Sequence, residues 1–395
     1  MTDCRAVQIG LILGLSILVG CAGLGKKDLD STYNLPGETN TDRGIFGETS
    51  DNLMTSFRSA VGLGPNETAA KDEFEQAMAS YRSASQLQGN ARRDAFEDVG
   101  KMFSKSAVRW PSSSIEEDSM FYRAESAFFA DRYPQAQTIF SNLIAKYPST
   151  RYIDKISQRR FQIAKYWLDH DQQHKQLPIA PNLARDRPTF DRFGNATKLL
   201  ERIRLDDPTG ELADDATMLA ATSCFERGKY YRADELLTDL RRSFPNSSHQ
   251  YNAHMLGLKT KIRLYQGPAY APGPLDAAEE LVKQMRRQFP SESRTDDGFL
   301  DSAYKDIRMN RAVREITQAR YRDQRKEYRA ARVLYERVAR EFSDTSLSKD
   351  AEVRLAQLEG LPDLPPQRLQ VLAKAFPSNS EEQPLIASPG SGTRR

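Results

Sequence analysis

Two pairs of histidines have a spacing from which a metal site could be built. His170 and His174 are four residues apart, and His249 and His254 are five apart. Two histidines separated by four residues lie on one face of a helix and can share a zinc ion. A zinc site needs three or four ligands, however, and neither a zinc-protease Glu after His170 nor a nearby cysteine or third histidine is present. We therefore expect no metal site at either pair.

Residues suited to catalysis are equally sparse. Cys224 falls on an apolar stripe and is interpreted as a small core residue, with a reactive thiol as the alternative. The acidic run 116–118 heads a predicted helix, where negative charge favours the helix dipole, and is not interpreted as an acid/base pair. The chain contains no GxSxG, P-loop or GxGxxG motif. The sequence favours a non-catalytic protein without a cofactor, and a hydrolase with its site in loop insertions is the alternative.

Arginine is concentrated between Arg311 and Arg340, with Tyr321, Tyr328 and Tyr335 interspersed. Arginines beside stacking aromatics could bind nucleic acid. Acidic residues lie among them, however, and the net charge of the chain is only +3, so we expect no nucleic-acid partner. A solvated helix face with intrahelical ion pairs accounts for most of the pattern. A protein-docking face is the alternative, because Arg and Tyr are enriched in interface hot spots.

Residues 1–20 have the form of a lipoprotein signal peptide. Residues 7–19 are almost entirely apolar but too short for a bilayer span, which needs roughly 20 residues. The sequence LVGC at 18–21 resembles the lipobox of bacterial lipoproteins. The resemblance implies cleavage before Cys21 and three acyl chains on that residue. Because no Asp follows Cys21, it also implies an outer-membrane location.

The two ends of the mature chain differ in composition from its body. Residues 21–66 are rich in Gly, Thr, Asn and Asp and are predicted to be a flexible tether with a reach on the order of 35 Å. Residues 377–395 are rich in Ser, Pro and Gly and are predicted to be disordered. The segment 67–376 between them is predicted to be a helical repeat domain.

The body repeats one pattern: a small residue, a large apolar residue four positions later, another three later, and a proline five after that. Full copies are Ala136-Phe140-Leu143-Pro148, Ala196-Leu200-Ile203-Pro208, Ala233-Leu237-Leu240-Pro245 and Ala278-Val282-Met285-Pro290. Weaker copies are Val99-Phe103-Ser106-Pro111, Ala331-Tyr335-Val338-Ser343 and a late one, Leu369-Leu372-Pro377. The offsets place the apolar residues on one helical stripe, and the proline ends the helix.

A second amphipathic helix precedes several of these copies, with short turns at 131–133 and 228–230 between the two helices. Helix, turn, helix and proline is the tetratricopeptide (TPR) arrangement, whose usual period is about 34 residues. We therefore predict an all-α, TPR-like α-solenoid of about six to seven helix pairs. Longer steps between copies predict loop insertions at 170–192, 266–274 and 291–298.

Two of these repeats resemble the BamD/ComL family, the TPR lipoproteins of the outer-membrane β-barrel assembly machinery. The resemblance lies in residues 118–152, DSMFYRAESAFFADRYPQAQTIFSNLIAKYPSTRY, and in residues 224–248. It implies a lipid-anchored scaffold that faces the periplasm and binds a β-barrel assembly protein and unfolded outer-membrane proteins. A scaffold of another envelope process, such as cell division, peptidoglycan synthesis or secretion, is the alternative.

The resemblance also implies where partners bind. In that family the N-terminal repeats take the client segment, and the C-terminal repeats hold the periplasmic domain of the barrel protein. The residues expected near the client are Tyr122, Arg123, Phe129 and Arg132. Those expected near the docked partner are Arg311, Arg314, Arg322, Tyr328 and Arg332.

Overall fold

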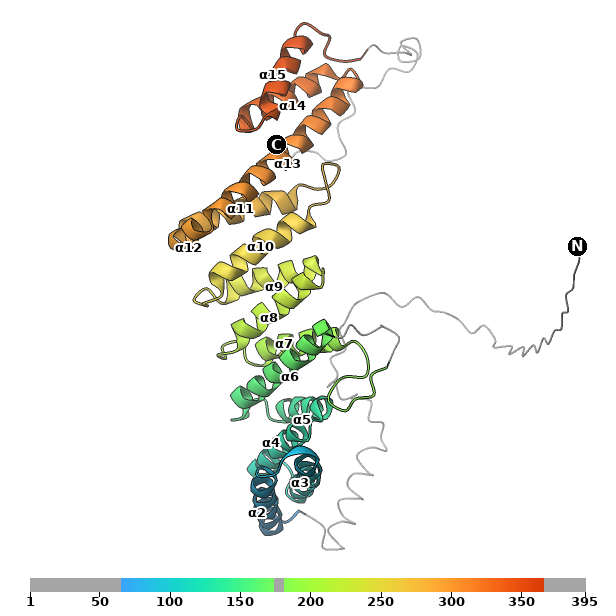
Figure 1. Cartoon of the computed structure of the whole chain (residues 1–395), viewed down its shortest axis with the longest axis vertical. Coiled ribbons are helices and arrows are strands. Elements are labelled where there is room, and N and C mark those ends of the chain that lie inside the picture. Colours follow the sequence, from blue (N-terminus) through green and yellow to red (C-terminus); the bar gives the residue numbers. More distant parts are fainter. Residues whose placement is uncertain (1–64, 174–180, 366–395) are drawn as a thin grey trace, which may run out of the picture. The chain divides into compact units, whose positions relative to one another are not determined.

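In the described part of the chain, helices form where apolar residues recur on one stripe. The computed structural model describes residues 65–173 and 181–365, and these residues contain fourteen α-helices and no strand. Each helix packs against the next one along the chain (Figure 1). The predicted all-α fold class is therefore confirmed.

The helices are arranged as successive pairs. In chain order they are α2 (Glu67–Ala84), α3 (Gly89–Arg109), α4 (Ser114–Phe129), α5 (Tyr133–Lys146), α6 (Ile153–Gln173), α7 (Arg192–Asp206), α8 (Ala213–Glu226), α9 (Tyr230–Ser243), α10 (Gln250–Leu264), α11 (Gly273–Gln288), α12 (Pro290–Thr295), α13 (Asp297–Gln324), α14 (Tyr328–Glu341) and α15 (Leu347–Leu358). The pairs are α2–α3, α4–α5, α6–α7, α8–α9, α10–α11 and α13–α14. The helix α15 follows as one further first helix, which agrees with the predicted TPR-like solenoid.

The predicted repeat residues form the core between the pairs. In each of the six copies that the structure describes, the three stripe residues are at most 3% exposed. The small residue at the first position, such as Ala136, lets the facing helix approach closely. The large residues fill the space that this leaves, so truncating Phe140 to alanine costs about 3–5 kcal/mol. The late copy at 369–377 lies outside the described residues.

The second helix of most pairs ends at an aromatic residue that precedes proline. Tyr147 has left the helical region, with φ −126° and ψ 78°, and its amide donates to the carbonyl of Leu143 at 2.7 Å. Phe244 and Phe289 repeat this geometry. The cause is steric, because the residue before a proline is disfavoured in the α region.

In the pairs α4–α5, α8–α9 and α13–α14, the turn between the two helices is a left-handed helix cap. Asp131, Gly228 and Lys326 have φ values of 58°, 77° and 61°. In each case the amide of the following residue donates to the carbonyl five positions earlier, as Lys229 does to Cys224 at 2.8 Å. This is the Schellman motif, which satisfies carbonyls that the end of a helix leaves unpaired. The turns predicted at 131–133 and 228–230 are therefore confirmed.

One predicted loop is wrong. The segment 291–298 was expected to be irregular, but it forms the short helix α12 and the start of α13. Pro290 is the first residue of α12. A backbone N–H at that position would have no partner within the helix, so proline loses no hydrogen bond there, and its fixed φ suits a helix. Ser293 also donates to the carbonyl of Met285 at 3.0 Å, which holds α12 against the end of α11.

The insertion predicted at 170–192 is non-helical at residues 181–191, but residues 170–173 belong to α6 and Arg192 begins α7. The insertion predicted at 266–274 is non-helical up to residue 272, and α11 begins at Gly273. In the described part of the chain, no helix is both long enough and apolar enough to cross a membrane. The predicted signal peptide, Cys21, almost all of the tether and the C-terminal tail lie outside the described residues.

Candidate functional site

Tyr122 and Phe129, two of the residues predicted near the client, lie on one face of α4 and share an aromatic neighbour on α2. The ring centroid of Tyr81 is 5.5 Å from that of Tyr122 and 6.2 Å from that of Phe129. All three side chains are half-buried. Residues seven apart return to nearly the same face of an α-helix, which explains why this spacing brings Tyr122 and Phe129 together.

Two arginines lie over this aromatic surface. The guanidinium carbons of Arg92 and Arg159 are 5.1 Å and 5.0 Å from the ring centroid of Phe129. A cation–π contact of this kind contributes about 0.5–2 kcal/mol. Arg159 also donates two hydrogen bonds of 2.7 Å to the buried carboxylate of Glu125. We name as the aromatic face the set Tyr81, Arg92, Tyr122, Phe129 and Arg159.

Sequence reasoning missed three members of the aromatic face. Tyr81, Arg92 and Arg159 come from α2, α3 and α6, at least 30 residues away from Phe129 in the chain. No local spacing links them to α4. The signal that could have found them is the repeat itself, because the first helices of successive pairs stack beside one another.

Arg123 and Arg132 lie on a different surface from Tyr122 and Phe129. They line a hollow of about 250 Å³ between α3, α4 and α5. The Nε of Arg132 donates to the carboxylate of Glu97 at 2.6 Å. Consecutive residues are about 100° apart around a helix, so Arg123 diverges from its neighbour Tyr122. The structure thus divides the residues predicted near the client between two surfaces.

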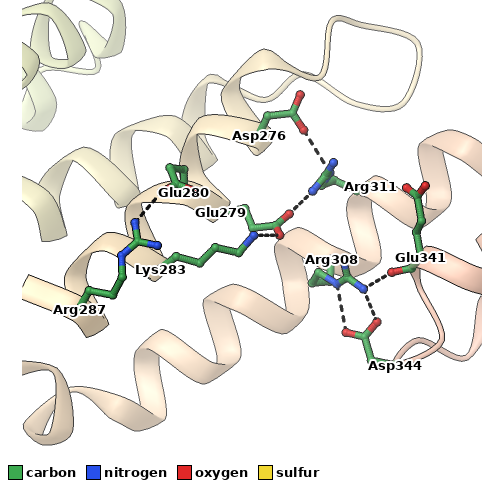
Figure 2. Close-up of polar contacts among 9 residues, drawn as sticks. All are labelled: Asp276, Glu279, Glu280, Lys283, Arg287, Arg308, Arg311, Glu341 and Asp344. Atoms are coloured by element: carbon green, nitrogen blue, oxygen red, sulfur yellow. Dashed lines mark hydrogen bonds and ion pairs between the residues drawn. The ribbon is translucent and has the colours of Figure 1, made fainter. Parts of the chain in front are cut away.

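Arg311, predicted near the docked partner, holds two helices of the chain together. It pairs with Asp276 and with the buried carboxylate of Glu279, both on α11 (Figure 2). The Nζ of Lys283 lies 2.7 Å from the same Glu279 carboxylate. Burial tends to raise the pKa of Glu279, but the bonds from Lys283 and Arg311 outweigh burial and keep that pKa below its usual value.

Arg308, which sequence reasoning did not select, extends this network. Its guanidinium donates to the carboxylate of Asp344 and to the carbonyl of Glu341 (Figure 2). The same guanidinium lies 4.8 Å from the ring centroid of Phe342. Arg308 and Arg311 are three residues apart and therefore share a side of α13. Together they fasten α13 to α11 and to the end of α14.

Three more of the predicted docking residues also have contacts within the chain. Arg332 donates to the carbonyl of Leu358 at 3.1 Å, which joins α14 to the end of α15. Arg314 donates to the carbonyl of Tyr270 at 3.2 Å, in the loop before α11. Tyr328 is half-buried and packs on the core between α13, α14 and α15.

Arg322, the remaining predicted docking residue, belongs to an exposed group at the end of α13. Tyr321 is 52% exposed, and the guanidinium carbons of Arg322 and Arg325 lie 5.8 Å and 5.6 Å from its ring centroid. Glu327 pairs with both arginines. We name Tyr321, Arg322 and Arg325 the Tyr321 cluster. An exposed tyrosine flanked by arginines is the composition of an interface hot spot.

The histidines at 249 and 254 are not placed to share a metal. His254 is 2% exposed, and its Nδ1 lies 2.8 Å from the carbonyl oxygen of Gln250. Burial lowers the pKa of His254. His249 instead faces α8, with its Nε2 2.5 Å from the carboxylate of Asp215. The two imidazoles therefore have separate partners.

The other candidate chemical groups are placed as follows. His170 lies near the end of α6, with its Nδ1 3.3 Å from a guanidinium nitrogen of Arg192, and His174 lies outside the described residues. Cys224 lies on α8 and is buried in the hydrophobic core between neighbouring helices, and this burial raises the pKa of its thiol. Residues 65–173 and 181–365 contain no group of three or more His, Cys, Asp or Glu that could hold a metal ion.

Two parts of the chain match models of known protein families. Residues 189–359, which comprise α7 to α15, match a family model described as an outer membrane lipoprotein, YfiO. Residues 118–150, which cover α5 and most of α4, match a tetratricopeptide-repeat model. No curated protein gives a significant match. The predicted resemblance to BamD-like TPR lipoproteins is confirmed by these matches.

Proposed function

We propose that this BamD-like TPR lipoprotein is a non-catalytic scaffold that binds proteins at the outer membrane, in the assembly of outer-membrane β-barrel proteins. The observation that carries the proposal is the match of residues 189–359 to the outer membrane lipoprotein family. The helix pairs support it, because stacked pairs offer an extended surface for other chains. A second candidate is a scaffold of another envelope process. The match at 118–150 favours it, because that model describes a tetratricopeptide repeat in general and not one particular process.

The proposed anchor is Cys21. The LVGC sequence at 18–21 supports acylation of this residue. One acyl chain gives only marginal membrane binding, whereas several chains give a durable anchor. The helical body would then stand in the periplasm on the tether that follows Cys21.

The proposed docking surface for a β-barrel assembly protein is the Tyr321 cluster. Arg308 and Arg311 fasten the middle of α13 to α11 and to the end of α14, and the exposed Tyr321 lies on the same helix. A rigid support lowers the entropic cost of binding at exposed side chains. Arg311, Arg314, Tyr328 and Arg332 would act here as supports for the docking surface.

The proposed surface for unfolded outer-membrane proteins is the aromatic face. Its half-buried rings can cover apolar side chains, and Arg92 can contact backbone carbonyls or carboxylates of an extended segment. Tyr122 and Phe129 belong to this face.

Affinity purification from detergent-solubilised envelope tests the docking proposal. We expect the wild-type chain to recover a β-barrel assembly protein. The double variant Tyr321→Ala, Arg325→Ala should reduce that recovery at least fivefold. The reason is that each hot-spot side chain contributes about 1–2 kcal/mol or more to the binding free energy. The matched control is Tyr231→Ala on α9, whose side chain is 70% exposed and lies outside the cluster.

The outcomes separate the two candidate functions. Recovery of division, peptidoglycan-synthesis or secretion proteins in place of a β-barrel assembly protein would favour the second candidate. Equal losses in the cluster variant and in Tyr231→Ala would reject the Tyr321 cluster as the docking surface.

Fractionation of Cys21→Ala cells tests the anchor independently. We expect the variant chain to move from the membrane to the soluble periplasmic fraction. Persistent membrane association of the variant would place the anchor elsewhere.

A further inference from the structure

Arg123 differs from the other half-buried arginines of this chain. Within residues 65–173 and 181–365 it is the one half-buried arginine whose guanidinium makes no hydrogen bond, ion pair or contact with an aromatic ring. Arg132 and Arg159, of similar burial, each hold a carboxylate, and Arg92 lies over two rings. A partly desolvated cation without a partner is unfavourable unless water or a ligand satisfies it.

The surroundings of Arg123 leave room for a ligand. Its hollow of about 250 Å³ is lined by residues of α3, α4 and α5. A water molecule occupies roughly 30 Å³ in the liquid, so the hollow is large enough for several waters or for part of a ligand. We name as the Arg123 groove the residues Gly100, Lys101, Ser104, Arg123, Arg132 and Gln135.

The charge around this hollow is positive. Its charged lining consists of the three cations Lys101, Arg123 and Arg132 and the single carboxylate Glu97, which gives a net charge of +2. Glu97 is already held by Arg132 and lies 3.5 Å from Arg185, so two guanidinium groups offset its repulsion of an anion. The pair that Lys101 forms with Asp98 is highly exposed and therefore weak.

The hollow continues beyond Arg123. A second hollow, of about 570 Å³, shares Glu97 and Ala130 with the first and is bordered by the rings of Tyr133 and Tyr166. Two adjoining hollows of this size exceed what a single small ion would fill. The charged lining of the second hollow is Arg93 and Arg185 against Asp94, Glu97, Asp131 and Asp186, a net charge of −2. A bound segment would therefore place its carboxylates in the first hollow, at Arg123, and an uncharged or basic part beside the tyrosines.

We propose that the Arg123 groove binds an extended acidic segment of a partner protein, with a carboxylate of that segment on the Arg123 guanidinium. An Arg–carboxylate pair in a partly enclosed groove is stronger than the same pair in open solvent, and its two parallel hydrogen bonds fix the segment's position. The groove is a surface separate from the aromatic face and the Tyr321 cluster. The proposal for the Arg123 groove can therefore be tested independently of the proposed function.

Peptide binding to the purified full chain in detergent tests this proposal. The probe is a fluorescein-labelled peptide of about ten residues that alternates Glu and Ala, followed by fluorescence anisotropy at low ionic strength, where charge pairing is least screened. A peptide that alternates Lys and Ala is the charge control. We expect the wild-type chain to bind the Glu peptide and not the Lys peptide.

Charge reversal locates the site. Arg123→Glu should weaken binding of the Glu peptide at least tenfold. The matched control is Arg263→Glu, because Arg263 on α10 is exposed and has no ion pair in the described part of the chain. It makes the same change in net charge and should weaken binding less than twofold.

A second variant guards against a folding defect in Arg123→Glu. Ser104→Glu supplies a carboxylate inside the groove, leaves Arg123 in place and should also weaken binding of the peptide. Failure of the wild-type chain to bind the Glu peptide would overturn the proposal, as would equal weakening by Arg263→Glu. Displacement of the peptide by an equal concentration of inorganic phosphate would show a general anion site and would also overturn it.

Discussion

Arg159 of α6 holds Glu125 of α4 through two hydrogen bonds of 2.7 Å, while its guanidinium lies 4.6 Å from the ring centroid of Phe128. One side chain thus joins the first helices of two successive pairs. The side chain of Glu125 is only 7% exposed, and Arg159 is the cation that pairs with it. The contact therefore fixes how the second and third pairs stack.

Removing this partner should destabilise the chain. We expect Arg159→Gln to lower the free energy of unfolding by about 2–4 kcal/mol, because it leaves a buried carboxylate unpaired. Urea denaturation followed by circular dichroism measures the change. The control is Arg93→Gln, since Arg93 and Asp131 form an exposed pair whose loss should cost less than about 1 kcal/mol. Similar costs for the two variants would contradict the structural role of Arg159.

The buried carboxylate of Glu279 should make stability sensitive to acid. Burial tends to raise its pKa, but Lys283 and Arg311 lower the pKa below that of the unfolded chain. A lowered folded-state pKa contributes stability above the unfolded value, about 4.3, and this contribution is lost as the pH falls through the folded-state pKa.

We therefore expect Glu279→Gln to be less stable than wild type at pH 7, and we expect this difference to be smaller at pH 3. Denaturation midpoints at the two pH values measure this difference. Glu280→Gln is the matched control, because Glu280 is the next residue on α11 and its pair with Arg287 is exposed (Figure 2). An undiminished difference between wild type and Glu279→Gln at pH 3 would argue against the ion-pair network.

His254 should add a second acid sensitivity at higher pH. Burial lowers the pKa of this imidazole below that of the unfolded chain. The stability that the neutral imidazole contributes is fully present above the pKa of the unfolded chain, about 6.5. It is lost as the pH falls toward the pKa of the folded state. We expect the loss of stability between pH 7.5 and pH 5.5 to be smaller in His254→Gln than in wild type. An equal loss in wild type and in His254→Gln would exclude His254 as the source.

The left-handed turns should respond oppositely to two substitutions. Lys326 has φ 61° and carries a side chain where glycine is favoured, so Lys326→Gly should raise the melting temperature, with a gain of about 0.5–1 kcal/mol. Gly228 has φ 77°, so Gly228→Ala should cost about 1 kcal/mol or more. Thermal unfolding checks both, and stabilisation by Gly228→Ala would contradict the assigned turn geometry.

Much of the fold was predictable from local spacing. The offsets of four and three that link Ala233, Leu237 and Leu240 place all three on one stripe, and each is at most 1% exposed. The segment 291–298 was predicted wrongly because a proline that usually ends a helix also suits the start of the next one. Sequence spacing alone does not distinguish these two uses of proline.

The sequence by itself determined that this chain forms paired helices, because a helix stripe and its proline stop are set within about fifteen residues. Only the tertiary structure decided that Tyr122 and Arg123 serve different surfaces and that Arg311 is held by Glu279, 32 residues away. The physical reason is that ion pairs and ring contacts depend on how successive pairs stack. That stacking depends on the packing of many residues from separate helices, so it cannot be predicted from a local sequence pattern.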